Sequence, residues 1–405
     1  MADRPAALIA AFATALVASL LSFMTIAAVL PNLIAEWRLS GAEAGWIGGI
    51  LFAGYVVSAL GLAPLTDRMD PKRVYLGAAA VGAIGAFGFA LFADGLWSAL
   101  LFRFLTGIGI GGTHMPGLKA LTDRLDPKSR SRGVVYYTAV FALGSGLSIY
   151  VGGEAAAWFG WRWAFAIGGL GFLTAAAIVA SVLPARAAQP RAPQAGHVLD
   201  FRPVLRNRAI VGYMLAAIGT AWEVFASRVW LVTFFVMLQG RDGGTYVFNP
   251  PAIATLLALI GVPASMLIGE AANRYPRTKV LMAVSGVSAA SALAIALFLG
   301  APYEAIVALC FLFAAVSYGR NAANTGGAVA AAEPHLRGTT LALNAAVSFS
   351  GGLIGPSAAG IALDLGGGVS SPFAWQVCMA TIALGPVVSL LAVYFLVPPA
   401  PVKSR

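Results

Sequence analysis

Long apolar runs alternate with short polar connections along the whole chain. A helix of roughly 20 apolar residues is long enough to cross the hydrocarbon core of a bilayer. The pattern therefore predicts an all-α integral membrane protein. We expect twelve transmembrane helices at residues 7–30, 44–65, 73–93, 96–119, 133–155, 161–183, 209–238, 251–272, 279–300, 303–332, 338–363 and 372–397. The first run is too long for the core of a signal peptide, so we retain it as a helix.

A polar stretch divides the predicted helices into two sets of six. Residues 184–208 are rich in Pro, Ala and Arg and have no apolar face wide enough to span a membrane. We therefore expect an N-terminal six-helix bundle over 1–183, a cytoplasmic linker over 184–208 and a C-terminal six-helix bundle over 209–405.

Positive charge is concentrated on one side of the predicted membrane. The formal net charge is +10, and the connections on one side carry 20 of the 26 Lys and Arg residues. Those on the other side carry only Arg38, Arg162 and Arg241. Because Lys and Arg are enriched in cytoplasmic loops, both termini are expected in the cytoplasm. The charge thus indicates topology within membrane lipid, and no nucleic-acid partner is expected.

The remaining composition argues against several classes of protein. Cys310 and Cys378 both lie in apolar runs, so neither a disulfide framework nor a metal site is expected. The three histidines, His114, His197 and His335, are scattered, which argues against a membrane enzyme. No nucleotide-binding loop follows a strand, which argues against ATP-driven transport within this chain. No cofactor is expected. Arginine outnumbers lysine 21 to 5, which is typical of a GC-rich bacterial genome and favours a bacterial inner membrane.

A charged phrase occurs twice in this otherwise apolar chain. Residues 65–73 read LTDRMDPKR and residues 121–128 read LTDRLDPK, at an offset of 56 residues. That offset covers two predicted spans, so both copies are expected at the cytoplasmic face. A weaker version, GEAANRYPRTK at 269–279, has Asn273 where the first copy has Asp67.

The first copy in its context, GLAPLTDRMDPKRV, resembles the loop signature of the major facilitator superfamily. RFLTGIGIGG in the fourth predicted helix and the central linker resemble the same superfamily. The resemblance covers the whole chain and implies the twelve-helix fold, alternating-access transport and no enzymatic activity. The seventh helix is similar to that of bacterial cyanate- or nitrate-transporter-like or organic-anion members. A monomer is expected.

By this resemblance the repeated phrase marks a cytoplasmic gate. Its candidate residues are Asp67, Arg68, Arg73, Asp123 and Arg130. The Asp67 carboxylate is expected to pair with Arg130 or Arg132, or with a helix N-terminus, when the cytoplasmic side closes. Alternatively, these charges only fix the topology.

Four charged residues lie well inside predicted spans, away from the span ends, where each costs about 2.5–3.5 kcal/mol on insertion scales. They are Arg103 in the fourth helix, Glu223 and Arg228 in the seventh and Arg320 in the tenth. One carboxylate cannot neutralise three guanidinium groups, and a guanidinium group binds a carboxylate bidentately. The excess of positive charge therefore favours an anionic substrate.

The resemblance implies that the first, fourth, seventh and tenth helices line a central cavity. The candidate substrate-binding residues are Arg228, Arg320, Asn324, Arg103 and Ser22. Asn324 follows Arg320 by one helical turn, so the two offer a carboxylate a cation and an amide. Five residues turn an ideal helix by about 140°. Glu223 and Arg228 are therefore expected to contact different partners.

Glu223 and His114 are the candidates for proton coupling. Glu223 is the one carboxyl group near the middle of a predicted span, where an anion on a neighbouring arginine would change whether it is protonated. A histidine titrates near neutral pH, which suits a proton relay. The alternatives are a structural ion pair of Glu223 with Arg320 or Arg228, and a hydrogen-bonded structural histidine.

These features predict a secondary active transporter that moves a small anionic solute, such as a carboxylate, by proton-coupled alternating access. The alternative is a proton-coupled efflux antiporter for drugs or metabolites, with Glu223 acting on cationic or lipophilic ligands. Drug-antiporter branches of the superfamily carry a Gly-Pro motif in the fifth helix. The fifth helix here has no Gly-Pro pair, although Gly355-Pro356 occurs in the eleventh, and this difference argues against the efflux antiporter.

Overall fold

The computed structural model describes residues 5–66, 68–183, 201–244, 246–333 and 336–398. Its elements in these ranges are fourteen α-helices. They are α1 (Pro5–Leu20), α2 (Thr25–Trp37), α3 (Gly41–Leu65), α4 (Pro71–Phe92), α5 (Leu96–Thr122), α6 (Pro127–Phe159), α7 (Trp161–Val182), α8 (Arg202–Arg206), α9 (Arg208–Asp242), α10 (Pro250–Arg274), α11 (Arg277–Leu297), α12 (Tyr303–Ala331), α13 (Arg337–Leu365) and α14 (Pro372–Leu396).

Twelve helical segments of the described chain are long and apolar enough to cross a membrane. α1 and α2 together form the first, Pro5–Trp37. The predicted all-α membrane fold with twelve spans is therefore confirmed. The largest difference is in the first helix, predicted over 7–30, which is interrupted and reaches Trp37. Asp67 and most of the predicted linker 184–208 lie outside the described residues.

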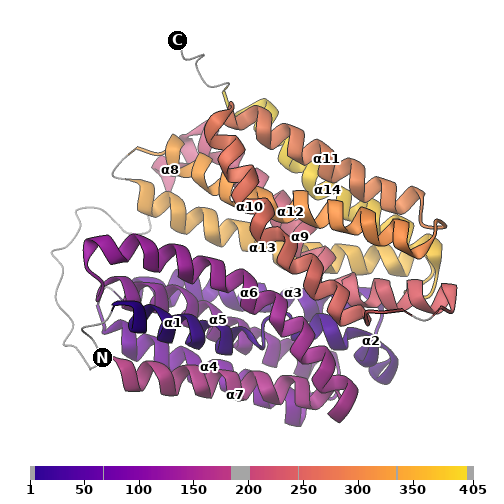
Figure 1. Ribbon diagram of the computed structural model, residues 1–405, viewed down its shortest axis with the longest axis horizontal. Helices are drawn as coiled ribbons and strands as arrows, with labels where there is room; N and C mark the ends of the chain where they lie inside the picture. The colour runs from indigo at the N-terminus through magenta and orange to yellow at the C-terminus, as the bar shows by residue number, and fades with distance from the viewer. Residues whose placement is uncertain (1–4, 67, 184–200, 245, 334–335, 399–405) are drawn as a thin grey trace.

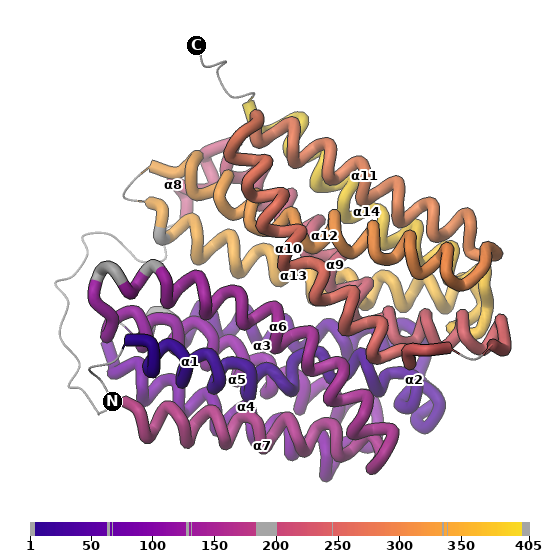
Figure 2. The backbone as a smooth tube through the Cα atoms, viewed as in Figure 1, coloured from indigo at the N-terminus to yellow at the C-terminus, as the bar shows by residue number. Residues whose placement is uncertain are grey.

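The helices lie in two groups side by side (Figure 1). α1 to α7 form the first group and α9 to α14 the second, and Figure 2 shows the same separation along the backbone. The groups meet where α3 packs on α13 and α6 packs on α10. Because successive spans run in opposite directions, α1 begins and α14 ends at the same end of the molecule. We call this the terminal end and the other, which holds the connections after α2 and α13, the distal end.

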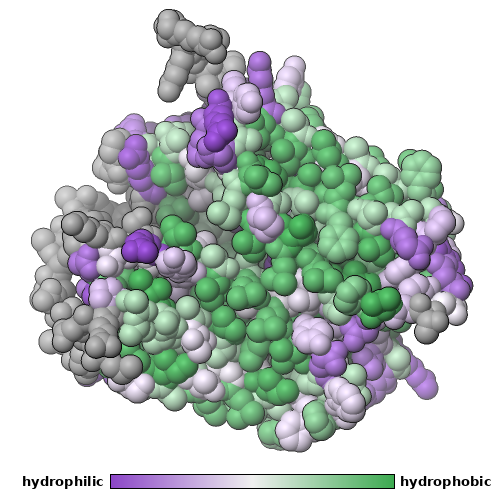
Figure 3. All heavy atoms as spheres, in the orientation of Figure 1, coloured by the Kyte–Doolittle hydropathy of each residue, from purple (hydrophilic) through white to green (hydrophobic). Residues whose placement is uncertain are grey.

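Apolar side chains cover the middle of the face shown in Figure 3, and hydrophilic ones gather toward its left and right ends. Exposed tryptophans lie near the distal end: Trp97 at the start of α5, Trp158 at the end of α6 and Trp163 at the start of α7. Tryptophan is enriched where membrane spans meet the lipid headgroups. The outer surface therefore matches a protein surrounded by lipid.

The first span is broken in its middle. α1 ends at Leu20 and α2 begins at Thr25, so residues 21–24 leave backbone groups without helical partners. The Met24 N–H donates to Ser148 Oγ of α6 at 3.0 Å. Inside a membrane, a break of this kind persists only where other parts of the protein satisfy the freed backbone groups. The break therefore depends on residues far away in the sequence.

Near the distal end, the two groups are in backbone contact where α3 meets α13. Gly41, Gly45 and Gly49 recur every four residues on one face of α3. A Cβ atom at each of them would overlap a carbonyl oxygen of α13. Small residues allow membrane helices to approach this closely, so these glycines are required by the contact between the groups.

Polar links reinforce this contact at the distal end. The Asp364 carboxylate, near the end of α13, accepts the N–H of Gly41 at 2.6 Å and of Ala42 at 2.8 Å. The first turn of a helix has free N–H groups and favours a negative charge. Asn249, which precedes α10, donates to Glu154 of α6 at 2.9 Å. The structure is therefore closed at its distal end.

We predict that Gly45→Ala destabilises the protein. The added methyl group would lie against the backbone of Pro356 and Ser357, which cannot move aside as a side chain could. Overpacking of this kind costs about 1–3 kcal/mol. Gly77→Ala is the matched control, because Gly77 also lies inside a helix, α4, but nothing lies within 4 Å of a Cβ added there. Thermal unfolding of both purified variants measures the difference, and equal melting temperatures would contradict the prediction.

We predict that Asp364→Asn loosens the distal contact, because the first turn of α3 loses a charged acceptor. Losing a helix cap costs about 0.5–2 kcal/mol, so amide hydrogen exchange at Gly41 and Ala42 should accelerate about 2- to 30-fold. Asp94→Asn is the control, since this distal carboxylate accepts a hydrogen bond from Ser98 within the first group. Unchanged exchange in Asp364→Asn, or the same acceleration in the control, would contradict a stabilising role for the Asp364 carboxylate at the distal contact.

Candidate functional site

Arg103 of α5 binds the break in the first span. Its Nη1 donates to the Ser22 carbonyl oxygen at 3.0 Å and its Nη2 to the Phe23 carbonyl oxygen at 3.2 Å. The guanidinium group thus satisfies two carbonyl groups that the break leaves free. Ser22 Oγ lies against Gly168 of α7. The structure therefore places Arg103 and Ser22, both predicted to bind substrate, in the buried interior of the first group.

Arg320 of α12 and Glu223 of α9 form an ion pair, and both side chains are fully buried. Two serines of α11 complete it. Arg320 Nη1 donates to Ser285 Oγ at 2.7 Å, and Ser288 Oγ donates to Glu223 Oε2 at 3.1 Å. All three helices belong to the second group, so the pair lies inside that group. Of the two arginines that the sequence offered to Glu223, the structure selects Arg320.

Asn324 extends this polar cluster by one turn of α12. Its Nδ2 donates to Thr220 Oγ1 of α9 at 3.0 Å. Thr220 itself lies about one turn before Glu223. The structure therefore brings together three of the predicted residues, Glu223, Arg320 and Asn324, and adds Thr220, Ser285 and Ser288 to them.

Arg228 has different surroundings from the other two core arginines. Its Nη1 donates to Ser145 Oγ of α6 at 2.9 Å, which links the second group to the first. The guanidinium group lies over the Tyr318 ring of α12, with 4.4 Å from Cζ to the ring centroid. Arg228 is 8% exposed, and within the described chain no carboxylate pairs with it. Its Nε has no hydrogen-bond partner there, as is also true of the Nε atoms of Arg103 and Arg320. Glu223 and Arg228 thus contact different partners, as their spacing predicts.

Aromatic rings from both groups meet beside Arg228. Phe52 and Phe225 have ring centroids 4.1 Å apart, and so do Tyr55 and Phe349. We define the aromatic cluster by the residues that these ring contacts join: Phe23, Phe52, Tyr55, His114, Tyr137, Phe141, Phe225 and Phe349. Phe225 is three residues from Arg228 on α9, toward the terminal end. The cluster therefore lies directly on the terminal side of Arg228.

His114 of α5 is the member of this cluster that carries ring nitrogens. Its Nδ1 and the Tyr55 hydroxyl form a hydrogen bond of 2.7 Å. Its ring lies 4.5 Å from the Phe141 ring and is nearly parallel to the Tyr137 ring at 5.8 Å. Tyr137 also donates to the His114 carbonyl oxygen at 3.1 Å. The structure places His114 with these rings and apart from Glu223, the other residue predicted to couple protons.

Sequence reasoning missed the aromatic cluster, although one of its helices carried a signal. Tyr137, Phe141, Ser145 and Ser148 recur every three or four residues on α6 and so share one face. Each contacts a functional element described above. In an apolar helix, a single face that holds rings and hydroxyls points toward an interior site.

The predicted gate residues lie at the terminal end. Arg68 and Arg73 are exposed, Asp123 pairs with Lys119 at 3.1 Å, and Arg130 Nε donates to the Thr122 carbonyl oxygen at 3.1 Å. The expected partner of Arg130, Asp67, lies outside the described residues.

The two copies of the charged phrase do meet, through other residues. Asp70 of the first copy caps α4 by accepting the Lys72 N–H at 3.0 Å. It also lies 3.8 Å from the guanidinium group of Arg124 in the second copy. The repeat thus joins the start of α4 to the end of α5 within the first group.

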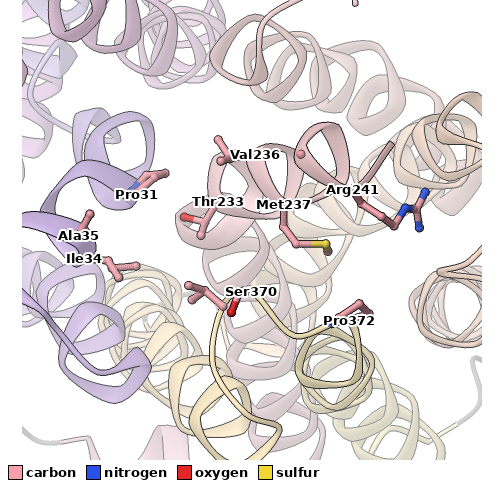
Figure 4. A pocket seen from close by; sticks show the side chains of 11 residues that line it. Pro31, Ile34, Ala35, Thr233, Val236, Met237, Arg241, Ser370 and Pro372 are labelled. Carbon is pink, nitrogen blue, oxygen red and sulfur yellow. The ribbon is translucent and has the colours of Figure 1, made fainter. Parts of the chain in front are cut away.

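A cavity of about 580 Å³ lies on the distal side of the cluster, between α2, α9 and the connection before α14 (Figure 4). It is lined mainly by apolar side chains, among them Pro31, Ile34 and Met237. Its cation, Arg241, is already paired with Asp242. The cavity is therefore a weaker candidate for binding an anion than the surroundings of Arg228, whose guanidinium group has no carboxylate partner in the described chain.

The chain is similar to bacterial transporters along most of its length. It is 27% identical to the gentisate transporter of Corynebacterium glutamicum over 84% of this chain and 77% of the relative. It is also 27% identical to the 4-hydroxybenzoate transporter PcaK of Pseudomonas putida, over 62% of this chain and 63% of the relative.

The fold is that of a known transporter structure. The crystal structure of a bacterial homolog of the human lysosomal transporter Spinster, in an inward-facing and unoccupied conformation, superposes with a TM-score of 0.80. The identity is 18%, and the superposition covers 97% of both chains. The family model of the Major Facilitator Superfamily matches residues 11–356. The chain therefore belongs to the Major Facilitator Superfamily, whose members are transporters rather than enzymes.

Proposed function

We propose that the protein takes up an aromatic carboxylate across the bacterial inner membrane, by alternating access coupled to protons. The observation that carries this proposal is Arg228, a buried guanidinium group between the two groups of helices that no carboxylate of the described chain pairs with. A substrate carboxylate would supply the missing partner.

Arg228 differs from the other core arginines in the groups that its guanidinium contacts. Arg103 donates to two backbone carbonyl oxygens through its Nη atoms, and Arg320 binds the Glu223 carboxylate and a serine. Arg228 has one neutral hydroxyl and one ring. Hydrogen bonds between ionised partners are roughly twice as strong as neutral ones. An anion that displaces Ser145 from Arg228 therefore gains binding free energy. At Arg103 or Arg320, an anion would have to displace two carbonyl oxygens or a carboxylate.

The aromatic cluster supplies the rest of the site. Its rings come from both groups and contact one another where the groups meet. Aromatic pairs prefer offset or edge-to-face contacts worth about 0.5–1.5 kcal/mol. The planar ring of an aromatic acid can replace one of these contacts when the groups separate. Gentisate and 4-hydroxybenzoate, the substrates for which the two relatives are named, are aromatic carboxylates and support this choice.

The Glu223–Arg320 pair is our candidate for proton coupling. It is fully buried and electrically neutral as a unit, so protonation of Glu223 would leave an uncompensated arginine in the second group. A substrate anion bound at Arg228 would change the free energy of this uncompensated positive charge through electrostatic attraction. The terminal end is the cytoplasmic one in this proposal, and the charged phrase with its Asp70–Arg124 contact belongs to the cytoplasmic gate.

We predict that Arg228→Gln weakens the binding of benzoate about 10- to 150-fold, because a hydrogen bond to a charged group contributes about 1.5–3 kcal/mol. Benzamide, the neutral analogue, should bind wild type and variant equally, so the preference for the carboxylate disappears. Titration calorimetry on the purified protein measures both ligands.

Arg162→Ala is the matched control for this experiment. Arg162 also lies over a ring, Trp161, at 4.4 Å and donates to a neutral oxygen, but it is far from the junction, at the start of α7. It should bind benzoate as the wild type does. Full benzoate affinity in Arg228→Gln, or tight binding of lipophilic cations to both proteins, would contradict the proposed function.

We predict that Glu223→Gln spares benzoate binding within about threefold but abolishes uptake driven by a proton gradient into proteoliposomes. Removing one member of a buried pair costs about 3–5 kcal/mol. We therefore expect the double variant Glu223→Gln/Arg320→Gln to fold better than the single variant and to lose proton coupling in the same way. Ser291→Ala, which removes a hydroxyl one turn further along α11, is the control. Uptake that still follows the proton gradient in both Glu223 variants would refute the assignment.

A further inference from the structure

Resting on the proposed function, we propose that His114, held by Tyr55, binds a ring hydroxyl of the substrate and selects hydroxylated aromatic carboxylates over unsubstituted ones. The inference comes from the arrangement of polar atoms around the aromatic cluster. Seven of its eight residues present only a ring or an already bonded hydroxyl, and His114 is the one that carries ring nitrogens.

One nitrogen of His114 is free to bind a ligand. Nδ1 is engaged by the Tyr55 hydroxyl at 2.7 Å. Nε2 has no hydrogen-bond partner in the described chain, and the residue is partly exposed rather than sealed in the core. Because the bond to Tyr55 occupies one ring nitrogen, the other is left to donate to or accept from a hydroxyl group.

The orientation of His114 is fixed from several sides. The Tyr137 ring is nearly parallel to it, and the centroids of the Phe141 and Tyr55 rings lie 4.5 Å and 6.2 Å from its own. A side chain held in this way loses little conformational freedom when a ligand binds. Specific recognition of a hydroxyl requires such a pre-oriented group.

The contacts that His114 and Arg228 make on α6 are offset along that helix by about the length of one aromatic acid. Arg228 contacts Ser145 and His114 contacts Phe141, and these two residues of α6 are four positions apart. Four residues advance a helix by about 6 Å. A benzene ring that carries a carboxylate and a hydroxyl group at opposite positions has a similar length. The carboxylate can thus meet Arg228 while the hydroxyl group meets His114.

The selectivity follows from the cost of unpaired polar groups. A phenolic hydroxyl that enters this site leaves water and needs a partner, which His114 Nε2 supplies. A site built to bind a hydroxyl group discriminates strongly against the analogue without it, because its own polar group is then left unpaired. Tyr55 acts by positioning the imidazole, without touching the substrate.

The test compares 4-hydroxybenzoate with benzoate on the purified full chain, by titration calorimetry. Wild type should bind 4-hydroxybenzoate at least tenfold more tightly than benzoate. His114→Phe, which keeps a ring for the stacking contacts, should reduce that ratio to about one while benzoate affinity stays within about twofold. Tyr55→Phe, which removes only the hydroxyl that orients the imidazole, should reduce the ratio at least threefold.

Two further variants separate this inference from the proposed function. Arg228→Gln should weaken both acids and preserve their ratio, and Tyr75→Phe, which changes a buried tyrosine outside the cluster, should alter neither. A His114→Phe variant that retains the wild-type ratio, or loses both acids in proportion, overturns the role of His114 but leaves the proposed function intact. If neither acid binds wild type, or if Arg228→Gln binds both normally, the proposed function fails and this inference with it.

Discussion

A charged side chain in the hydrocarbon region has to find its partners inside the protein, and this constraint governs the interior of the molecule. Each of the three core arginines meets it in a different way. Arg103 binds carbonyl oxygens of a broken helix, Arg320 binds a carboxylate, and Arg228 has only a hydroxyl and a ring. The first two each hold two acceptor groups of their own helix group through their terminal nitrogens. In the proposed function, the third is the one that would bind the substrate anion where the two groups meet.

The break in the first span connects folding to the site. A helix interrupted in a membrane must have its backbone groups satisfied elsewhere, and Arg103 and Ser148 do so from α5 and α6. The interruption also lets Phe23 join rings from α3, α6 and α9. An arginine that does not contact the proposed ligand thus shapes the surface that would bind it.

The distal contact and the site lie along the same pair of helices. α3 and α13 meet at glycines near the distal end and at Tyr55 and Phe349 in the middle. Separation of these helices at the distal end would therefore change the ring contacts in the middle. Through α3, closure of the distal side would be coupled to the geometry of the aromatic cluster, as alternating access requires.

The sequence by itself determined the twelve spans, because hydropathy is a local property that neighbouring residues express together. It also identified every charged residue in the core, and the five-residue spacing separated the partners of Glu223 from those of Arg228. It did not show which of Arg320 and Arg228 pairs with Glu223, nor that Asp70 lies near the guanidinium group of Arg124. Ser145, Tyr318 and the aromatic cluster also remained hidden. Those contacts join residues tens to more than a hundred positions apart, and only the packing of helix faces in three dimensions decides which of them meet.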